Sequence, residues 1–205
     1  MTRRPQQERS RATVAKILAA ADAEFSAHGG AATTTTRIAE RAGVSVGALY
    51  RFFPDKHAIA AALADRYLEV ARERFGALLA DVNHRDQVPD VLGRVVEVAA
   101  GLALEHAGYY RLTNEVRPDQ VGSVGHGVRT TMVDTFDGLL ESLGTQQDPR
   151  VRRAAVTLVI ETVRHTLAIS PVDGPERDVV ISELSEMVVI YARRRLGTRS
   201  EGDGE

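Results

Sequence analysis

Residues 34–53 read TTTRIAERAGVSVGALYRFF. They predict two short helices joined by one tight turn. Ala39 is small enough for the second helix to cross over it, and Gly43 can take the left-handed conformation that ends the first helix. Ser45 can cap the second helix, and Leu49 fills the space between the two helices. This is the build of a helix-turn-helix, whose second helix enters the major groove of DNA.

The composition is that of an ordinary globular protein. Of the 205 residues, 43% are hydrophobic and 26% are charged. The absence of cysteine excludes disulfides and thiolate metal sites and favours a reducing compartment. The opening MTRRPQQERSR lacks the apolar region of a secretory signal, and no apolar run approaches the ~20 residues of a membrane span. We therefore expect a cytoplasmic protein without a membrane partner.

Charge is divided unevenly along the chain, although the net charge is only −2. Residues 1–60 hold nine Lys or Arg against five Asp or Glu, a local charge of +4, and the remainder carries −6. Such an asymmetry indicates a basic module that meets phosphate and an acidic module with another task. A chance division of surface charge is the alternative.

The rest of the chain also predicts helices, because apolar residues recur at helical spacing and Gly and Pro fall between the blocks. Outside the helix-turn-helix, the expected helices are one that ends at Gly29-Gly30, one from Asp55 to about Val82, and 88–106, 109–115, 121–143, 149–169 and 175–196. The predicted fold is all-α. Its parts are a flexible basic arm (1–11), a three-helix helix-turn-helix DNA-binding domain (12–57), a larger helical ligand-binding and dimerisation domain (58–196) and a disordered tail (197–205). The arginines of the arm either reach a minor groove or are solvated.

The last two long helices are apolar nearly all the way round, in the runs AAVTLVI (154–160) and MVVIYA (187–192). Such helices need cover on two sides, and the same helices of a second copy would supply it in a two-fold four-helix bundle. The alternative is a pair of central helices in the core of one protomer. We expect a homodimer whose interface includes Val156, Ile160, Leu184, Val188 and Tyr191.

The flanks of the helix-turn-helix resemble the TetR family of bacterial transcription regulators. In that family a first helix ends in Phe and a glycine turn, the pattern I-A-x-x-A-G-V-S follows, the recognition helix ends in L-Y-x-H-F, and Lys opens the next helix. The counterparts are Phe25 with Gly29-Gly30, residues 34–45, residues 49–53 and Lys56. Phe52 stands where the family often has His. Thr36 stands where some members have a base-reading Arg, with Arg37 one position late.

The resemblance implies a set of DNA contacts. Ser45 is added to this set, because a cap at the start of a helix places N–H groups where a phosphate can sit. The expected DNA contacts are then Thr34, Thr35, Thr36, Ser45, Val46, Gly47, Ala48, Tyr50, Arg51 and Lys56. The threonines, the Tyr50 hydroxyl and the Lys56 ammonium would bind phosphate, which fixes register without reading sequence. Residues 46–48 and Arg51 would lie along base edges. Arg51 suits guanine N7 and O6, and a solvated or phosphate-bound arginine is the alternative.

The expected function is a DNA-binding transcriptional regulator that binds a palindromic operator on double-stranded DNA as a homodimer. The resemblance also implies repression and an apolar cavity in the larger domain for an unidentified small-molecule effector. The polar or aromatic residues near such a cavity by placement are His106, Tyr109, Tyr110, Asn114, His126 and His165. Packing or solvent exposure is the alternative for each. The other functions considered are an activator of the same family and a small-molecule-binding helical protein without operator binding.

Catalytic chemistry is not expected. The six histidines form no metal-ligand motif such as H-E-x-x-H. Glu161 and His165 share a helix face, which suits a metal or an acid–base pair but is more typical of a surface ion pair. Residues 122–127, GSVGHG, lack the preceding strand and the Lys-Ser/Thr ending of a phosphate loop. We expect no enzyme activity, no metal and no cofactor.

Overall fold

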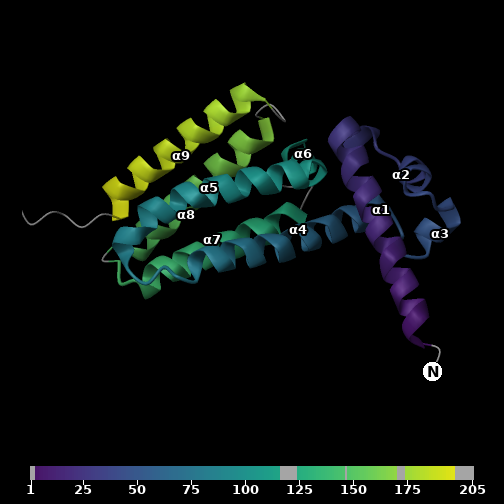
Figure 1. The fold of residues 1–205 in the computed structure, drawn as a ribbon, viewed down its shortest axis with the longest axis horizontal. Coiled ribbons are helices and arrows are strands. Elements are labelled where there is room, and N and C mark those ends of the chain that lie inside the picture. Colours follow the sequence, from purple (N-terminus) through teal and green to yellow (C-terminus); the bar gives the residue numbers. More distant parts are fainter. Residues whose placement is uncertain (1–2, 116–123, 146, 170–173, 197–205) are drawn as a thin grey trace, which may run out of the picture. The chain divides into compact units, whose positions relative to one another are not determined.

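The computed structural model describes residues 3–115, 124–145, 147–169 and 174–196. In chain order the elements are α1 (Arg3–Ala32), α2 (Thr35–Ala42), α3 (Val46–Tyr50), α4 (Lys56–Leu79), the 3-10 helix η1 (Arg85–Gln87), α5 (Val88–Glu105), α6 (Ala107–Glu115), α7 (Val124–Ser142), α8 (Pro149–Ile169) and α9 (Pro175–Leu196) (Figure 1). The predicted all-α fold is confirmed, and α8 and α9 keep their predicted bounds. Within the described ranges, no helix is long and apolar enough to cross a membrane.

Contacts divide the chain into two compact units. The first spans Met1–Glu69 and His106–Val128, and the second spans Val70–Glu105 and Arg129–Glu205. The chain passes from one unit to the other within α4, between α5 and α6, and within α7, so α6 belongs to the same unit as α1, α2 and α3. The domain boundary after residue 57 stays a prediction, and the packing units do not coincide with it.

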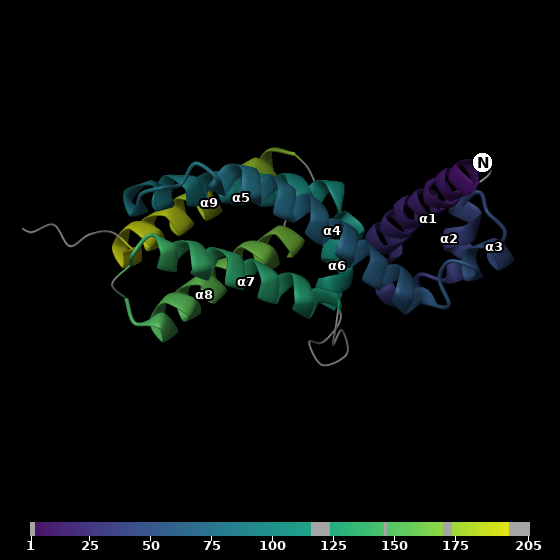
Figure 2. The same ribbon diagram turned by 90° about the horizontal axis from the view of Figure 1, so that it is seen from below.

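The core of the first unit lies where α1, α2, α3, α4 and α6 meet. Its fully buried large side chains are Ile17, Phe25, Ile38, Leu49 and Ile59, and Leu112 of α6 joins the same cluster. Burial of each such side chain contributes about 1.5–3 kcal/mol. Figures 1 and 2 show α2 and α3 along one side of α1. This packing holds the helix-turn-helix to a long supporting helix.

The two ends of α1 differ in how well the sequence predicted them. Residues 3–11, expected as part of a flexible arm, are helical. Pro5 is tolerated because it lies in the first turn, where backbone N–H groups have no helical partner, and the Thr13 hydroxyl donates to the Arg9 carbonyl (2.9 Å). At the other end the helix breaks at Gly29, with φ 74° and ψ 174°, which confirms the predicted glycine turn. The predicted tail at 197–205 lies outside the described residues.

Close contact with α1 explains why α6 belongs to the first unit. A Cβ added to Gly108 would lie 2.8 Å from the Asp22 Cα and closer still to its carbonyl oxygen, so glycine is needed for this approach. The Tyr109 N–H donates to the Asp22 carboxylate (3.1 Å), and the Arg111 guanidinium donates to the Ser26 carbonyl (2.6 Å). Burial raises the pKa of Asp22, and the N–H groups of α6 oppose that rise. The first turn of α6 is thus capped by a side chain of α1.

In the second unit, α5 packs against both α8 and α9 (Figure 2). Ion pairs join α7 to the start of α8. The buried Arg152 donates to Asp137 (2.8 Å), and Arg153 donates to Asp134 (2.6 Å). These paired charges fix the direction in which α8 leaves the turn after α7.

The apolar helices α8 and α9 bury one face and expose another. Val156, Leu184 and Val188 are at most 7% exposed, so the protomer's own core takes up their side chains. Ile160 and Tyr191 are half-buried. That these five residues belong to a dimer interface stays a prediction. The exposed large apolar residues of these helices are Val151, Leu158 and Ile169 on α8 and Val179, Met187 and Ile190 on α9.

Candidate nucleic-acid interface

The first helix of the helix-turn-helix has a cap at each end. Thr34 is the N-cap of α2, and its hydroxyl accepts from the Arg37 N–H (3.3 Å). Gly43 ends α2 in the left-handed conformation, with φ 67° and ψ 33°, and the Val44 N–H then donates to the Ala39 carbonyl (3.0 Å). Ala39 is 1% exposed, as a helix crossing requires. The predicted turn is confirmed.

The recognition helix α3 presents small residues on its outer side. Ser45 is its N-cap and accepts from the Ala48 N–H (3.1 Å), while Leu49 is fully buried in the core. Gly47 is exposed, and a Cβ there would meet nothing within 4 Å. The helix therefore leaves room for base edges to approach its backbone.

The side chains at the end of α3 are exposed. The Tyr50 ring is 49% exposed, and its hydroxyl lies 3.0 Å from the Thr35 hydroxyl at the start of α2. Arg51 is exposed, and its guanidinium carbon lies 5.7 Å from the centre of the Phe52 ring. Thr36 is also exposed. Because a hydroxyl donates and accepts at once, the Thr35–Tyr50 pair can still donate one proton to a phosphate oxygen.

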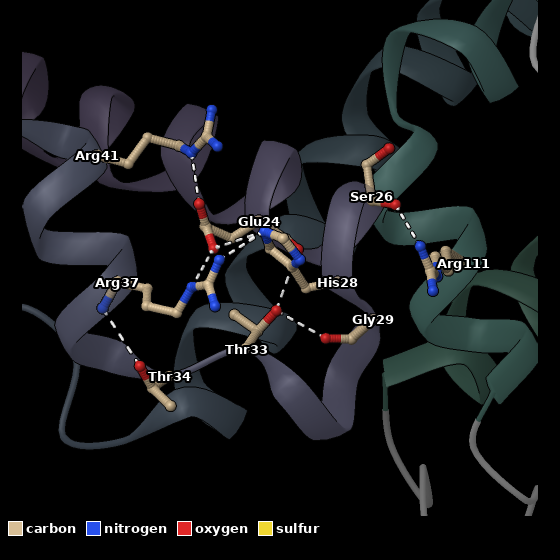
Figure 3. A network of polar contacts seen from close by, with 9 residues as sticks. All are labelled: Glu24, Ser26, His28, Gly29, Thr33, Thr34, Arg37, Arg41 and Arg111. Atoms are coloured by element: carbon tan, nitrogen blue, oxygen red, sulfur yellow. Dashed lines mark hydrogen bonds and ion pairs between the residues drawn. The ribbon is translucent and has the colours of Figure 1, made fainter.

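A buried carboxylate under α2 holds two arginines (Figure 3). Glu24 of α1 is 3% exposed and accepts from Arg41 (2.6 Å) and Arg37 (3.0 Å). The hydrogen bond from Arg41, supported by that from Arg37, holds the pKa of Glu24 below its ordinary value although burial opposes this. Arg37 also lies 2.6 Å from the His28 ring. Arg37 is therefore tied to two side chains of α1.

Lys56 has contacts inside the protein, and its expected contact with phosphate stays a prediction. Its ammonium donates to the carbonyls of Gly30 (2.5 Å), in the last turn of α1, and Thr33 (2.9 Å), which follows α1. The Thr33 side chain is buried, and its hydroxyl lies 2.7 Å from the Gly29 carbonyl and 3.1 Å from that of Glu24. Two of the three ammonium N–H donors are thus used inside the protein.

Sequence reasoning missed Glu24 and Thr33. Glu24 could have been found, because it lies seven residues after Ile17 and three after Ala21, on the apolar face of its helix. A charged residue on such a face needs a partner. Thr33 is the first of four consecutive threonines, and nothing in that run separates the buried member from the exposed ones.

Three of the predicted ligand residues come together in the first unit. Tyr109 stacks on Tyr67 of α4 with ring centres 4.3 Å apart, the hydroxyls of Tyr67 and Tyr110 are 2.9 Å apart, and His106 meets the edge of Tyr67 at 5.7 Å. All four side chains are buried. His165 is exposed on α8 in the second unit.

A groove of about 380 Å³ lies between α5 and α9 in the second unit. Its lining consists of Glu97, Ala100, Gly101, Leu104, Gly174, Arg177, Asp178 and Ile181. None of the predicted ligand residues is in that lining, and the side chains of Asn114 and His126 lie outside the described part of the chain. Within the described ranges, no group of three or more His, Asp or Glu could hold a metal ion.

A capped recognition helix with a small-residue outer face, packed with α2 against the long helix α1, is typical of a helix-turn-helix DNA-binding protein. The model of the family described as bacterial regulatory proteins, tetR family, matches residues 17–63. The chain belongs to the TetR family, and it is therefore a DNA-binding transcriptional regulator. Members of this family are in general not enzymes.

Solved structures of the family have the same fold over most of the chain. A TetR-family transcriptional regulator from Streptomyces coelicolor is 25% identical, with a TM-score of 0.65 over 90% of this chain and 99% of its own. GusR of Salmonella enterica is 21% identical, with a TM-score of 0.69 over 91% and 96%. A TetR-like transcriptional regulator from Rhodococcus sp. RHA1 is 20% identical, with a TM-score of 0.63 over 91% and 97%. A comparison with curated proteins found no match.

Proposed function

We propose that this regulator is a homodimeric repressor that binds a palindromic operator and that a small molecule releases from it. The observation that carries the proposal is the helix-turn-helix, with its capped α3, its small-residue outer face and the hydroxyl pair of Thr35 and Tyr50 beside it. One recognition helix contacts only a few base pairs. In a two-fold symmetric dimer, two helix-turn-helix domains would contact two half-sites about one helical turn or more apart. Because the two domains are related by a two-fold axis, the operator would be palindromic.

The exposed apolar side chains of α8 and α9 support dimerisation. Val151, Leu158 and Ile169 are spaced so that they share one face of α8, and Met187 and Ile190 lie on α9, all of them 46–65% exposed. Exposed apolar surface on two neighbouring helices is typical of an interface. Two such pairs would form a four-helix bundle across a two-fold axis.

The groove between α5 and α9 supports an effector site in the second unit. Its volume of about 380 Å³ is in the range of ligand pockets, and it combines apolar residues such as Leu104 and Ile181 with charged groups that can orient a ligand. An effector that binds better to the state unable to span two half-sites would lower operator affinity by its differential affinity for the two states.

DNA selection from a random pool tests the repressor model. We expect enrichment of an inverted repeat, a salt-sensitive gel shift on it, and weaker binding after addition of the correct metabolite. Arg51→Ala should relax preference at one or two base pairs by about 1–3 kcal/mol, whereas Tyr50→Phe should weaken all duplexes alike. Enrichment of no sequence would contradict the operator, and unchanged preference in Arg51→Ala would contradict direct readout.

Light scattering tests the dimer. The double variant Leu158→Asp and Ile190→Asp should be monomeric, because it places two charges in each half of the proposed interface. Leu104→Asp is the matched control, since Leu104 is 45% exposed but lies on α5. A wild-type mass of one protomer, or a double variant that stays dimeric, would contradict the interface.

A further inference from the structure

We propose that Lys56 is a positioning residue that joins the two ends of the helix-turn-helix, and that it is not a phosphate ligand. The proposal rests on the operator binding described above, because operator affinity is its readout. It assigns to Lys56 a task inside the protein that the family resemblance does not imply.

The contacts of Lys56 bracket the DNA-reading segment. Gly30 and Thr33, whose carbonyls accept from its ammonium at 2.5 and 2.9 Å, lie just before Thr34, the cap of α2. Lys56 itself is the first residue of α4, shortly after α3 ends. One side chain thus connects the chain entering the helix-turn-helix to the chain leaving it. Residues 34–55 form a loop that is closed at its base.

The end of α1 provides a reason for a cation at this place. The last carbonyls of a helix have no helical donor, and they carry the negative end of the helix dipole. The Thr33 hydroxyl serves the Gly29 carbonyl (2.7 Å), and Lys56 serves the carbonyls that follow. At the start of α4, where Asp55 caps the Ala58 N–H (2.8 Å), a lysine is unfavourable with respect to the dipole of its own helix. Its contacts with α1 offset that cost.

Loss of this closure would change recognition. DNA-reading side chains must be held within about 0.5 Å of the productive geometry by their supporting residues. The Thr35–Tyr50 hydrogen bond joins the DNA-facing ends of α2 and α3, and Lys56 joins the base. Without Lys56, α2 and α3 are free to shift against α1 while the apolar contacts of Leu49 remain.

The test compares Lys56→Met with Lys16→Met, since Lys16 is the other lysine of the chain and is exposed on α1. Both changes remove one positive charge from the same unit. Affinity for the selected operator and for a scrambled duplex is measured over a range of salt. We expect Lys56→Met to lose operator affinity on the order of tenfold. Its affinity for the scrambled duplex and its salt slope should equal those of Lys16→Met.

Two results would overturn the proposal. A phosphate ligand would lower the salt slope by about 0.9 per protomer relative to Lys16→Met and weaken both duplexes alike. Operator binding by Lys56→Met that equals that of Lys16→Met would show that the contact does not position the DNA-reading helices. A wild-type protein that selects no sequence refutes the proposed function instead, so the two failures are distinguishable.

Two further variants keep the test valid if Lys56→Met does not fold. Thr33→Val loosens the same turn without changing charge, so it should reproduce the loss of operator affinity at an unchanged salt slope. Lys56→Arg keeps the charge, but its planar fork does not reproduce one nitrogen bound to two carbonyls. If Lys56 positions the helix-turn-helix, Lys56→Arg should lose operator affinity. If Lys56 binds phosphate, Lys56→Arg should keep its operator affinity.

Discussion

Glu24→Gln tests whether the buried carboxylate fixes α2 against α1. The amide keeps the shape and one acceptor oxygen but loses the charge to which Arg41 and Arg37 donate. Hydrogen bonds to a charged group contribute about 1.5–3 kcal/mol each, and neutral ones about 0.5–1.5 kcal/mol. The two arginine side chains are 47% and 46% exposed, so water recovers part of the loss. The full difference for two hydrogen bonds is about 2–3 kcal/mol, and after allowance for this exposure we expect the α1–α2 contact to weaken by about 1–2 kcal/mol.

Hydrogen exchange read by mass spectrometry gives the local effect. Peptides within residues 24–41 should exchange about 5- to 30-fold faster in Glu24→Gln than in the wild type, if they open through this contact. Glu40→Gln is the matched control, because Glu40 is an exposed glutamate on α2. It should change exchange by less than about twofold. Equal exchange in Glu24→Gln and Glu40→Gln would refute the reasoning.

Acid provides a second readout with a defined sign. The folded protein lowers the pKa of Glu24 from its ordinary 4.5, so the group contributes stability above that pH and loses it as pH falls through the lower folded pKa. The stability difference between wild type and Glu24→Gln should therefore shrink below about pH 4.5. The contribution of Asp22 to stability changes with pH in the opposite direction, because burial raises its pKa. Both proteins contain Asp22, so its effect cancels in the difference between them. A difference that stays constant in acid would contradict the charge-based explanation.

Gly108→Ala should cost about 3 kcal/mol or more in urea unfolding followed by circular dichroism, because the added Cβ would overlap the Asp22 backbone. Gly76→Ala, on α4 with nothing within 4 Å of its Cβ, should be neutral or stabilising by ~0.5–1 kcal/mol, and equal effects would argue against the close approach. Acetylation followed by mass spectrometry should modify Lys16 about tenfold faster than Lys56, whose ammonium is engaged with two carbonyls. Equal rates would contradict that contact.

The sequence predicted what depends on neighbours along the chain. Gly43 and Ser45 were recognised as helix stop and helix start because a left-handed turn and a cap require those residue types locally. The bounds of α8 and α9 followed from Pro149 and Pro175, since proline is favoured at the first helical position. The helix-turn-helix is built almost wholly from such local requirements.

The sequence did not predict the direction in which a side chain points. In α8, Val156 is buried and Leu158 is exposed, and a helix that is apolar all round has no periodicity to tell the two apart. Lys56 could reach outward to phosphate or inward to carbonyls with the same spacing. The cap that Asp22 provides to α6 joins groups 87 residues apart, so no local pattern records it.

The last turns of α1 are where these non-local contacts gather. Asp22 caps α6, Glu24 holds α2, and Thr33 together with Lys56 closes the turn into α2 and the start of α4. Apolar packing around Phe25 supplies most of the free energy, but it is non-directional and tolerates small rotations. Charged hydrogen bonds have fixed donors and acceptors, so they set the angle at which each helix leaves α1. The polar contacts at the end of α1 therefore give the recognition helix one defined orientation, which the apolar core alone would not set.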